Sequence, residues 1–205
     1  MYVFKERKSP IQKDFPIIPN GKHFEIEIES TFHLKNLYKH THDWLQANSY
    51  YDPNSNDENF ETLFLRITKS NGLMFHHIWW RVIKKLNRAD SKNFHIFLKV
   101  NFQTIAVSKH ETMIEGKKFQ TYKGDVILRI KGYIRVDPED RWNDHPILKY
   151  FQKIMIERWL KNRIEEYKKY LYNDMIELNR QIKHYMGGKT GLPTEKQWNE
   201  SITGL

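Results

Sequence analysis

The sequence predicts an α+β fold in which a curved antiparallel sheet, with a helix inserted after its first strand, packs on one long C-terminal helix. Within 23–136, several segments alternate apolar and polar residues, the period of half-buried strands. Residues 34–48 instead space their apolar side chains three and four apart, as on one face of a helix. After Pro146 neither Gly nor Pro occurs before Gly187, which allows about 40 residues of helix.

The N-terminal residues 1–22 are predicted to form a basic extended arm, because they carry three prolines and the cluster Lys5–Lys8. From His23 the chain alternates strictly: Phe24, Ile26 and Ile28 point one way and Glu25, Glu27 and Glu29 the other. Ser30 or Thr31 can cap the helix that follows, which ends near Asn48. The polar run 52–57 has the composition of a loop.

The middle of the chain is predicted to form a meander of strands joined by short connections, so that neighbours are antiparallel. The side chains predicted to point inward are Leu63, Leu65, Ile67, Ile78, Trp80, Val82, Phe94, Ile96, Leu98, Val100 and Phe102. The clearest strand is 126–136, in which the even-numbered residues are apolar or Gly and the odd-numbered ones include Arg129, Lys131 and Arg135.

The long helix, 144–186, changes its apolar face along its length. Its first half carries Leu148, Phe151, Met155 and Trp159, which we expect to pack on the sheet. Its second half repeats apolar residues at nearly heptad spacing, and we expect this seam to seek another partner: Ile164, Leu171, Met175, Leu178, Ile182 and Tyr185. The resulting organisation is an arm (1–22), one domain (23–186) and a flexible tail (187–205), where a capping-box pattern at Thr194 and the nearby Trp198 predict a short docking helix.

Composition restricts the classes of function. The chain has 34 Lys and Arg against 25 Asp and Glu, a net charge of +9, which favours a polyanionic neighbour or a solvated basic face. It has no cysteine, which excludes disulfides, thiol catalysis and cysteine-based zinc sites. The charged start of the chain lacks the apolar core of a signal peptide, and no apolar run is long enough to span a membrane. We therefore expect a cytoplasmic or virion location rather than secretion.

Motifs for catalysis and metal binding are missing from the sequence. Among ten histidines only His40 and Asp43 share a helix face, and HExxH is absent, so no metal site is predicted. Lys189-Thr190 lacks the earlier glycine and the strand-to-helix context of a P-loop. Neither a nucleophile elbow nor a dinucleotide motif occurs, and no cofactor is predicted. An enzyme built from dispersed acids stays open, with Glu61, Glu111, Glu115 and Asp125 as the candidates.

The outward residues of the predicted sheet are cationic, and Lys99, Arg129, Lys131 and Arg135 are the candidate nucleic-acid or anion face. The Glu25, Glu27 and Glu29 row can neutralise part of it. Trp79 and Arg81 alternate with core residues, and this mixture suits either base stacking or a contact between the two side chains.

Over residues 23–186 the predicted elements are a strand, a helical insertion, antiparallel strands and a long final helix. This order resembles the helix-grip arrangement of START-like (SRPBCC) proteins. The resemblance implies an apolar cavity under the final helix, with ligand contacts from Leu148, Phe151, Met155 and Trp159. A closed core would use the same residues.

These observations favour a non-enzymatic binding and assembly module within a ribonucleoprotein, a virion or a homo-oligomer. Its contacts would be made by the second half of the long helix together with Trp198. The alternatives are a START-like carrier of an apolar ligand and a general nucleic-acid-binding protein.

Overall fold

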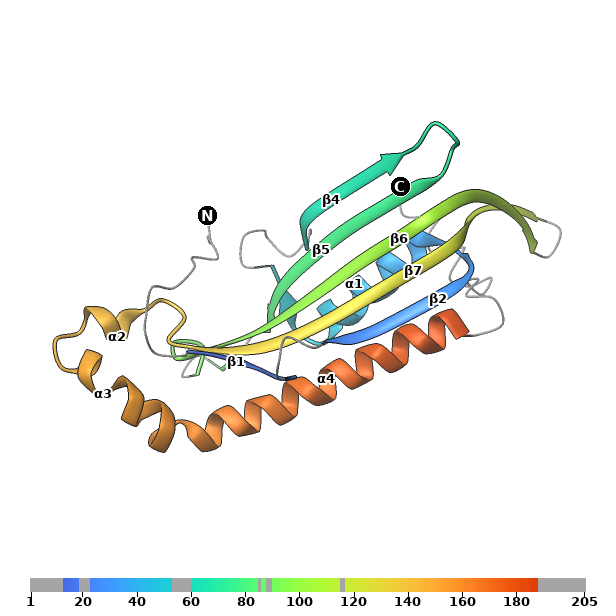
Figure 1. The fold of residues 1–205 in the computed structure, drawn as a ribbon. Helices are drawn as coiled ribbons and strands as arrows, with labels where there is room; N and C mark the ends of the chain where they lie inside the picture. Colours follow the sequence, from blue (N-terminus) through green and yellow to red (C-terminus); the bar gives the residue numbers. More distant parts are fainter. Residues whose placement is uncertain are drawn as a thin grey trace.

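The structure is a computed structural model that describes residues 13–18, 23–52, 60–84, 86–87, 90–114 and 117–187. Within these residues it has the predicted α+β architecture, an antiparallel curved sheet packed on a long C-terminal helix (Figure 1). The strands are β1 (Asp14–Pro16), β2 (Phe24–Phe32), β3 (Tyr50–Tyr51), β4 (Glu61–Thr68), β5 (Met74–Lys84), β6 (Phe94–Ile114) and β7 (Lys117–Val136). The helices are α1 (Leu34–Ala47), α2 (Arg141–Asp144), α3 (Leu148–Ile154) and α4 (Lys161–Gly187).

The long hairpin of β6 and β7 forms the centre of the sheet, with β5 beside β6. β1 and β2 both pair with the other side of β7, and β3 and β4 both pair with the other side of β5. β1 lies inside the predicted arm 1–22, where Asp14 stands opposite Arg135. The predicted tail, including Trp198, lies outside the described residues.

The inner face of the sheet carries the core. The even-numbered apolar residues of β7, from Val126 to Val136, are fully buried, as the alternation predicts. Aromatic side chains fill the space under α1: the ring of Trp80 lies 4.6 Å from that of Tyr38 and 4.7 Å from that of Phe102. α4 runs along β7 and β2 and closes the rest of this face.

The β6–β7 hairpin bends near its far end, where the pairing register shifts between Ile105 and Ser108. Ala106 at this bulge has a φ of 50°, and Gly124 across from it has a φ of 146°. A Cβ on Gly124 would lie 3.0 Å from the Cα of Val107, so only glycine fits there without displacing backbone. The bulge curls the end of the hairpin out of the plane of the sheet (Figure 1).

The C-terminal helix differs from the single helix predicted over 144–186. A π-helical turn at Met155–Trp159 separates α3 from α4, and the amide of Leu160 donates to the carbonyl oxygen of Met155 at 2.8 Å. The assignment of its two halves is also wrong. Ile164, Leu171, Met175, Leu178 and Ile182 are all at most 3% exposed in the core, whereas Phe151 is 49% and Trp159 73% exposed.

The reason for this reversal is the path of the chain. β7 ends at Val136, at the margin of the sheet, and the segment with α2 and α3 turns the chain round beyond that margin (Figure 1). Of this C-terminal segment, the returning helix α4 is the part that lies along the inner face. Five distal residues predicted as a partner interface are therefore core residues: Ile164, Leu171, Met175, Leu178 and Ile182.

β4 also departs from the prediction, because Leu63, Leu65 and Ile67 point outward and not into the core. Leu63 stands opposite Trp79 of β5, which is on the outer face, so alternation places all three on that face. They are 36%, 43% and 45% exposed. The alternating pattern identified a shared face correctly but not which face is buried.

Candidate interaction surfaces

Several large apolar side chains are exposed on residues 141–160, which we call the helical arm. Ile147, Tyr150, Phe151 and Ile154 follow the i, i+3, i+4, i+7 spacing of one helix face, and all are exposed. Trp159 is the last residue of the π-helical turn. The arm also carries the cations Lys149, Lys153 and Arg158, and Lys161 follows it at the start of α4. Such an uncovered apolar stripe is typical of a surface that binds another molecule.

A buried ion cluster holds the arm to the sheet. Lys13 places its Nζ 2.7 Å from Oδ2 of Asp137 and 2.8 Å from Oδ1 of Asp140. The side chains of Lys13 and Asp137 are 0% and 1% exposed, so each charge depends on the other for compensation. The ring of Trp142 lies 5.6 Å from the same ammonium group.

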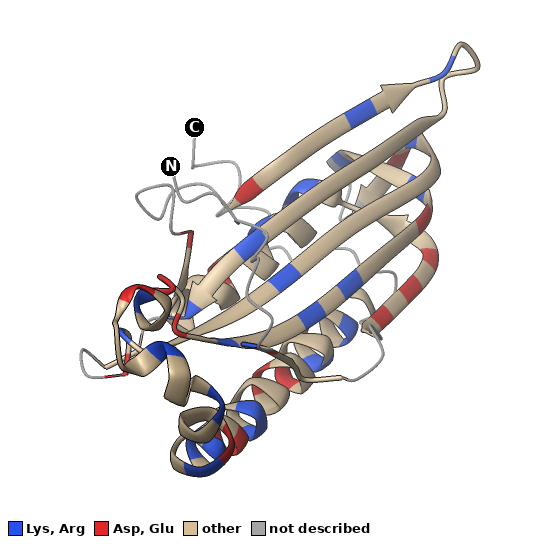
Figure 2. Ribbon diagram, turned by 60° about the vertical axis from the view of Figure 1, so that its left-hand side comes forward, with Lys and Arg blue, Asp and Glu red and all other residues tan. Residues whose placement is uncertain are grey.

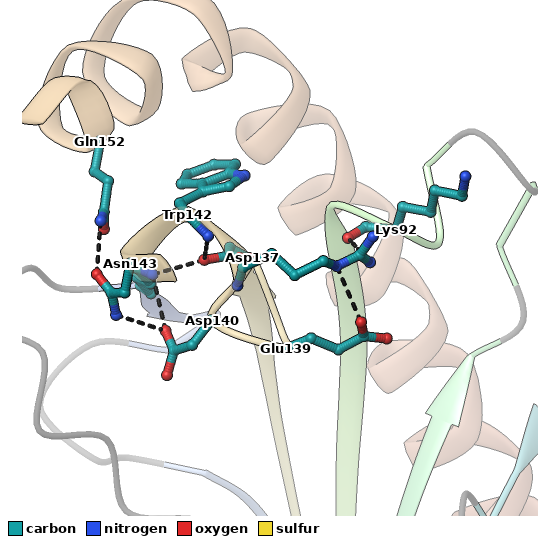
Figure 3. Close-up of polar contacts among 9 residues, drawn as sticks. Lys92, Asp137, Glu139, Asp140, Trp142, Asn143 and Gln152 are labelled. Atoms are coloured by element: carbon teal, nitrogen blue, oxygen red, sulfur yellow. Dashed lines mark hydrogen bonds and ion pairs between the residues drawn. The ribbon is translucent and has the colours of Figure 1, made fainter. Parts of the chain in front are cut away.

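Further polar contacts continue this cluster into the arm (Figure 3). Asp137 accepts hydrogen bonds from the backbone amides of Arg141 at 2.9 Å and Trp142 at 3.2 Å, which caps α2. Gln152 of α3 donates to Oδ1 of Asn143 at 2.6 Å. The hydrogen bonds of Asp137 thus join α2 to the body, and the bond between Gln152 and Asn143 joins α3 to α2. Sequence reasoning missed this cluster because Lys13 and Asp137 are 124 residues apart.

A second apolar surface, which we call the edge surface, consists of Leu63, Leu65 and Ile67 of β4 with Trp79 of β5. Trp79 is 39% exposed. In the described part of the chain, β4 pairs only with β5, so the other side of β4 presents backbone donors and acceptors without a neighbouring strand.

The predicted cationic face is partly neutralised. Arg129 Nε donates to Glu25 at 2.6 Å, and Nη1 of the same residue donates to Gln103 at 2.7 Å. The pKa of Glu25 is lowered by its hydrogen bond from His23 and then by that from Arg129. Arg135 makes a bidentate contact with Asp14 at 2.7 and 2.8 Å. The expectation that the Glu row offsets part of this face is confirmed at Glu25.

The remaining cations form one row across three strands, because Arg81 pairs with Lys99 and Lys99 pairs with Lys131. Figure 2 shows Lys and Arg positions side by side on the central strands. No described carboxylate lies within ion-pair distance of Lys99 or Lys131. Burial lowers the pKa of Lys99, and the nearby Arg81, Arg135 and Lys131 lower it further, whereas Asp14 acts in the opposite direction. Lys99 and Lys131 also line a hollow of about 270 Å³ beside β1.

The histidines and dispersed acids make local contacts. His40 stacks on Tyr185 at 4.8 Å, and burial lowers the pKa of His40. Glu61 accepts a hydrogen bond from the hydroxyl of Tyr38 at 2.8 Å, and Glu111 lies 3.8 Å from Lys118. Among the described residues, no three His, Asp or Glu side chains converge as metal ligands would.

The residues implied by the START-like resemblance lie on the arm or at its end. Leu148 and Met155 are half-buried, and Phe151 and Trp159 are exposed. The inner face of β7 is instead closed by α4, where Leu171 and Met175 lie against Gly132. Tyr185, the last residue of the predicted seam, is partly buried.

None of the helices in the described part of the chain is both long and apolar enough to cross a membrane. No protein-family model matches the chain, and no curated protein sequence matches it. The surfaces of the molecule are therefore the guide to its function.

Proposed function

We propose that the chain is a non-enzymatic assembly module that associates with a second copy of itself through β4. The observation that carries this proposal is the edge surface. It lies mainly on β4, a strand of eight residues whose large apolar side chains are all exposed. A long apolar edge of this kind is a template for another strand, because the backbone groups on its outer side can continue the hydrogen-bonded ladder.

The sequence of β4 is complementary to itself when two copies run antiparallel about Leu65. Leu65 then stands opposite Leu65 of the second copy, and Leu63 stands opposite Ile67 in both directions. All the apolar residues of the outer face are matched with apolar residues, and the contact is closed by a twofold axis. Trp79 extends the same apolar face on each side.

Charge favours a second copy at β4 and disfavours it at the helical arm. Between Thr62 and Ile67 the only charged residue is Arg66, which lies on the opposite face of β4 from Leu65. The arm, by contrast, carries Lys149, Lys153 and Arg158, of which Lys153 pairs with Glu157 at 3.9 Å, and a symmetric contact would bring the cations of two copies together. The arm therefore suits a partner with acidic groups beside an apolar groove, which is compatible with a role inside a larger assembly.

The test is the mass of the protein in solution, measured by light scattering after size exclusion at roughly 100 µM, well above a micromolar dissociation constant. We expect the wild-type chain to have twice its 25.0 kDa. Leu65→Lys should be monomeric, because it places two like charges against each other at the twofold axis. Met113→Lys is the matched control: Met113 is 63% exposed but lies on β6, so this variant should remain dimeric.

A monomeric wild type, or a Leu65→Lys variant that keeps the dimer mass, contradicts pairing through β4. Loss of the dimer in Trp159→Lys but not in Leu65→Lys would assign self-association to the arm. Circular dichroism shows whether each variant has kept its fold.

A second candidate function is binding of a polyanion such as single-stranded nucleic acid. It is favoured by the row of Arg81, Lys99 and Lys131, which places three cations next to one another on adjacent strands. The helix-grip interpretation, with its carrier role, remains a third candidate. The sheet and long helix are compatible with it, but Leu171 and Met175 fill the place of the cavity.

A further inference from the structure

A pocket of about 390 Å³ lies on the inner face of the sheet, between the first turn of α1 and the curled end of the β6–β7 hairpin. The bulge at Ala106 and Gly124 creates it, because the hairpin beyond the bulge forms one of its walls. Its described lining residues come from α1, β4, β5, β6 and β7, and none comes from α4 or the helical arm. The pocket is therefore separate from the space under the final helix.

The body of this pocket is apolar and aromatic. Ile78 and Tyr122 line it from the sheet, and Tyr38 and Phe64 line it from α1 and β4. Ile78 is buried, whereas Phe64 is 53% exposed, so the apolar lining extends from the interior to the mouth. A volume of about 390 Å³ is within the range of small-molecule sites, roughly 300–1,000 Å³.

The polar groups of the pocket are mainly cationic. Lys35 of α1, Arg66 of β4 and Lys109 of β6 all line it, and all three side chains are exposed. No described carboxylate lines the pocket or lies within ion-pair distance of these three residues. The contact that Arg66 makes is a weak one, from Nη2 to the sulfur of Met74 at 3.3 Å. Three cations from three elements thus converge on a space with no described counter-charge.

We propose that this pocket binds a small amphiphilic carboxylate, whose apolar body lies on Ile78, Tyr38 and Phe64 and whose carboxylate group contacts Lys35, Arg66 and Lys109. An anionic group supplies the counter-charge that the three cations lack, and the apolar lining removes the rest of the ligand from water. His76 adds a polar group to the wall of the pocket. It is 3% exposed, and its Nδ1 is hydrogen-bonded to Oγ1 of Thr104 at 2.8 Å.

The probe is decanoate, with decanol as the uncharged ligand of the same chain length, and binding is measured by isothermal titration calorimetry. The wild type should bind decanoate at least about tenfold more tightly than decanol, the ratio that one charge-assisted contact provides. In Lys35→Gln/Lys109→Gln, decanoate binding should weaken at least about tenfold while decanol binding is unchanged. The matched control is Lys153→Gln/Arg158→Gln on the arm, which loses the same charge and should bind decanoate as the wild type does.

Neither Lys35 nor Lys109 belongs to β4, so the oligomeric state of the Lys35→Gln/Lys109→Gln variant should not change. The ligand-binding test and the test of assembly through β4 can therefore fail independently of each other. Equal affinity for decanoate and decanol overturns the proposal. The absence of decanoate binding at millimolar concentration also overturns it. A third contrary outcome is a Lys35→Gln/Lys109→Gln variant that circular dichroism shows to be folded and that binds decanoate as the wild type does.

Discussion

Gly132 determines how closely α4 approaches the sheet. It lies in β7 on the inner face, and a Cβ added there would be 2.6 Å from Sδ of Met175 and 2.9 Å from Cδ2 of Leu171. Those distances are shorter than van der Waals contact, so a side chain at this position must displace the helix or its buried residues. The missing side chain therefore allows the close contact that buries Leu171 and Met175.

We expect Gly132→Ala to lower the free energy of unfolding by about 1–3 kcal/mol, as overpacking does. Met175→Ala should lower it by about 2–5 kcal/mol through loss of packing. The double variant should lose less than the sum, because the new methyl group enters space that the methionine has vacated. Urea denaturation of the four proteins measures the coupling. Additive losses would mean that α4 does not contact the sheet at Gly132.

Charged residues show how far single positions can be predicted. Glu25 and Arg129 fall in outward rows of two regular strands, so alternation predicted that both lie on the outer face, whereas the register that sets them opposite each other comes from the structure. Lys13 gives no such signal, because its partner Asp137 lies 124 residues further along the chain, in the irregular segment after β7, and has a φ of 48°. A contact of this kind depends on the path of the whole chain, which periodicity does not describe.

Among the elements, β2, α1, β5, the first part of β6 and the last part of β7 could be predicted from periodicity, and the structure confirms them. The extension of β6 and β7 over 103–125 was not predicted. Periodicity could not predict which face of β4 is exposed, or which half of the C-terminal helix packs on the sheet. Periodicity shows that Leu63 and Leu65 share a face, or that Phe151 and Met155 share a stripe, but what covers that face depends on tertiary structure. The edge surface escaped prediction for the same reason. The pocket escaped prediction because its lining residues come from segments that are distant in the sequence.

The reversal of the two helix halves leads to a paired prediction. Leu171→Ala removes a fully buried side chain and should lower the free energy of unfolding by about 2–5 kcal/mol. Trp159→Ala removes a larger side chain that is 73% exposed, so its effect should stay within about 0.5 kcal/mol. Thermal or urea unfolding of the two variants at one protein concentration compares them. A larger loss for Trp159→Ala would mean that the arm, and not α4, packs on the sheet.

At the scale of the whole molecule, the net charge of +9 is unevenly distributed. On the outer face Glu25 and Asp14 neutralise the two arginines at positions 129 and 135, and the helical arm carries its own cluster of cations. Lys99 and Lys131 differ from both groups, because they lie next to each other on adjacent strands and beside a hollow. Burial is the main cause of the lowered pKa of Lys99, and the neighbouring cations Arg81, Arg135 and Lys131 add to it. A phosphate placed there would reduce the repulsion among these cations.

We expect a single-stranded oligonucleotide to bind this face with an affinity that falls steeply as salt concentration rises, because each neutralised phosphate releases condensed counterions. Lys99→Glu/Lys131→Glu should weaken binding and reduce the slope of log affinity against log salt by about 0.7 for each phosphate that the variant no longer neutralises. Arg129→Gln/Arg135→Gln should have the smaller effect, since those guanidinium groups already contact carboxylates. The control is Lys153→Glu/Arg158→Glu, which makes the same change of net charge on the arm. Fluorescence anisotropy at several salt concentrations measures all four proteins. If the arm variant loses as much affinity as Lys99→Glu/Lys131→Glu, binding follows net charge and not the row of cations on the sheet.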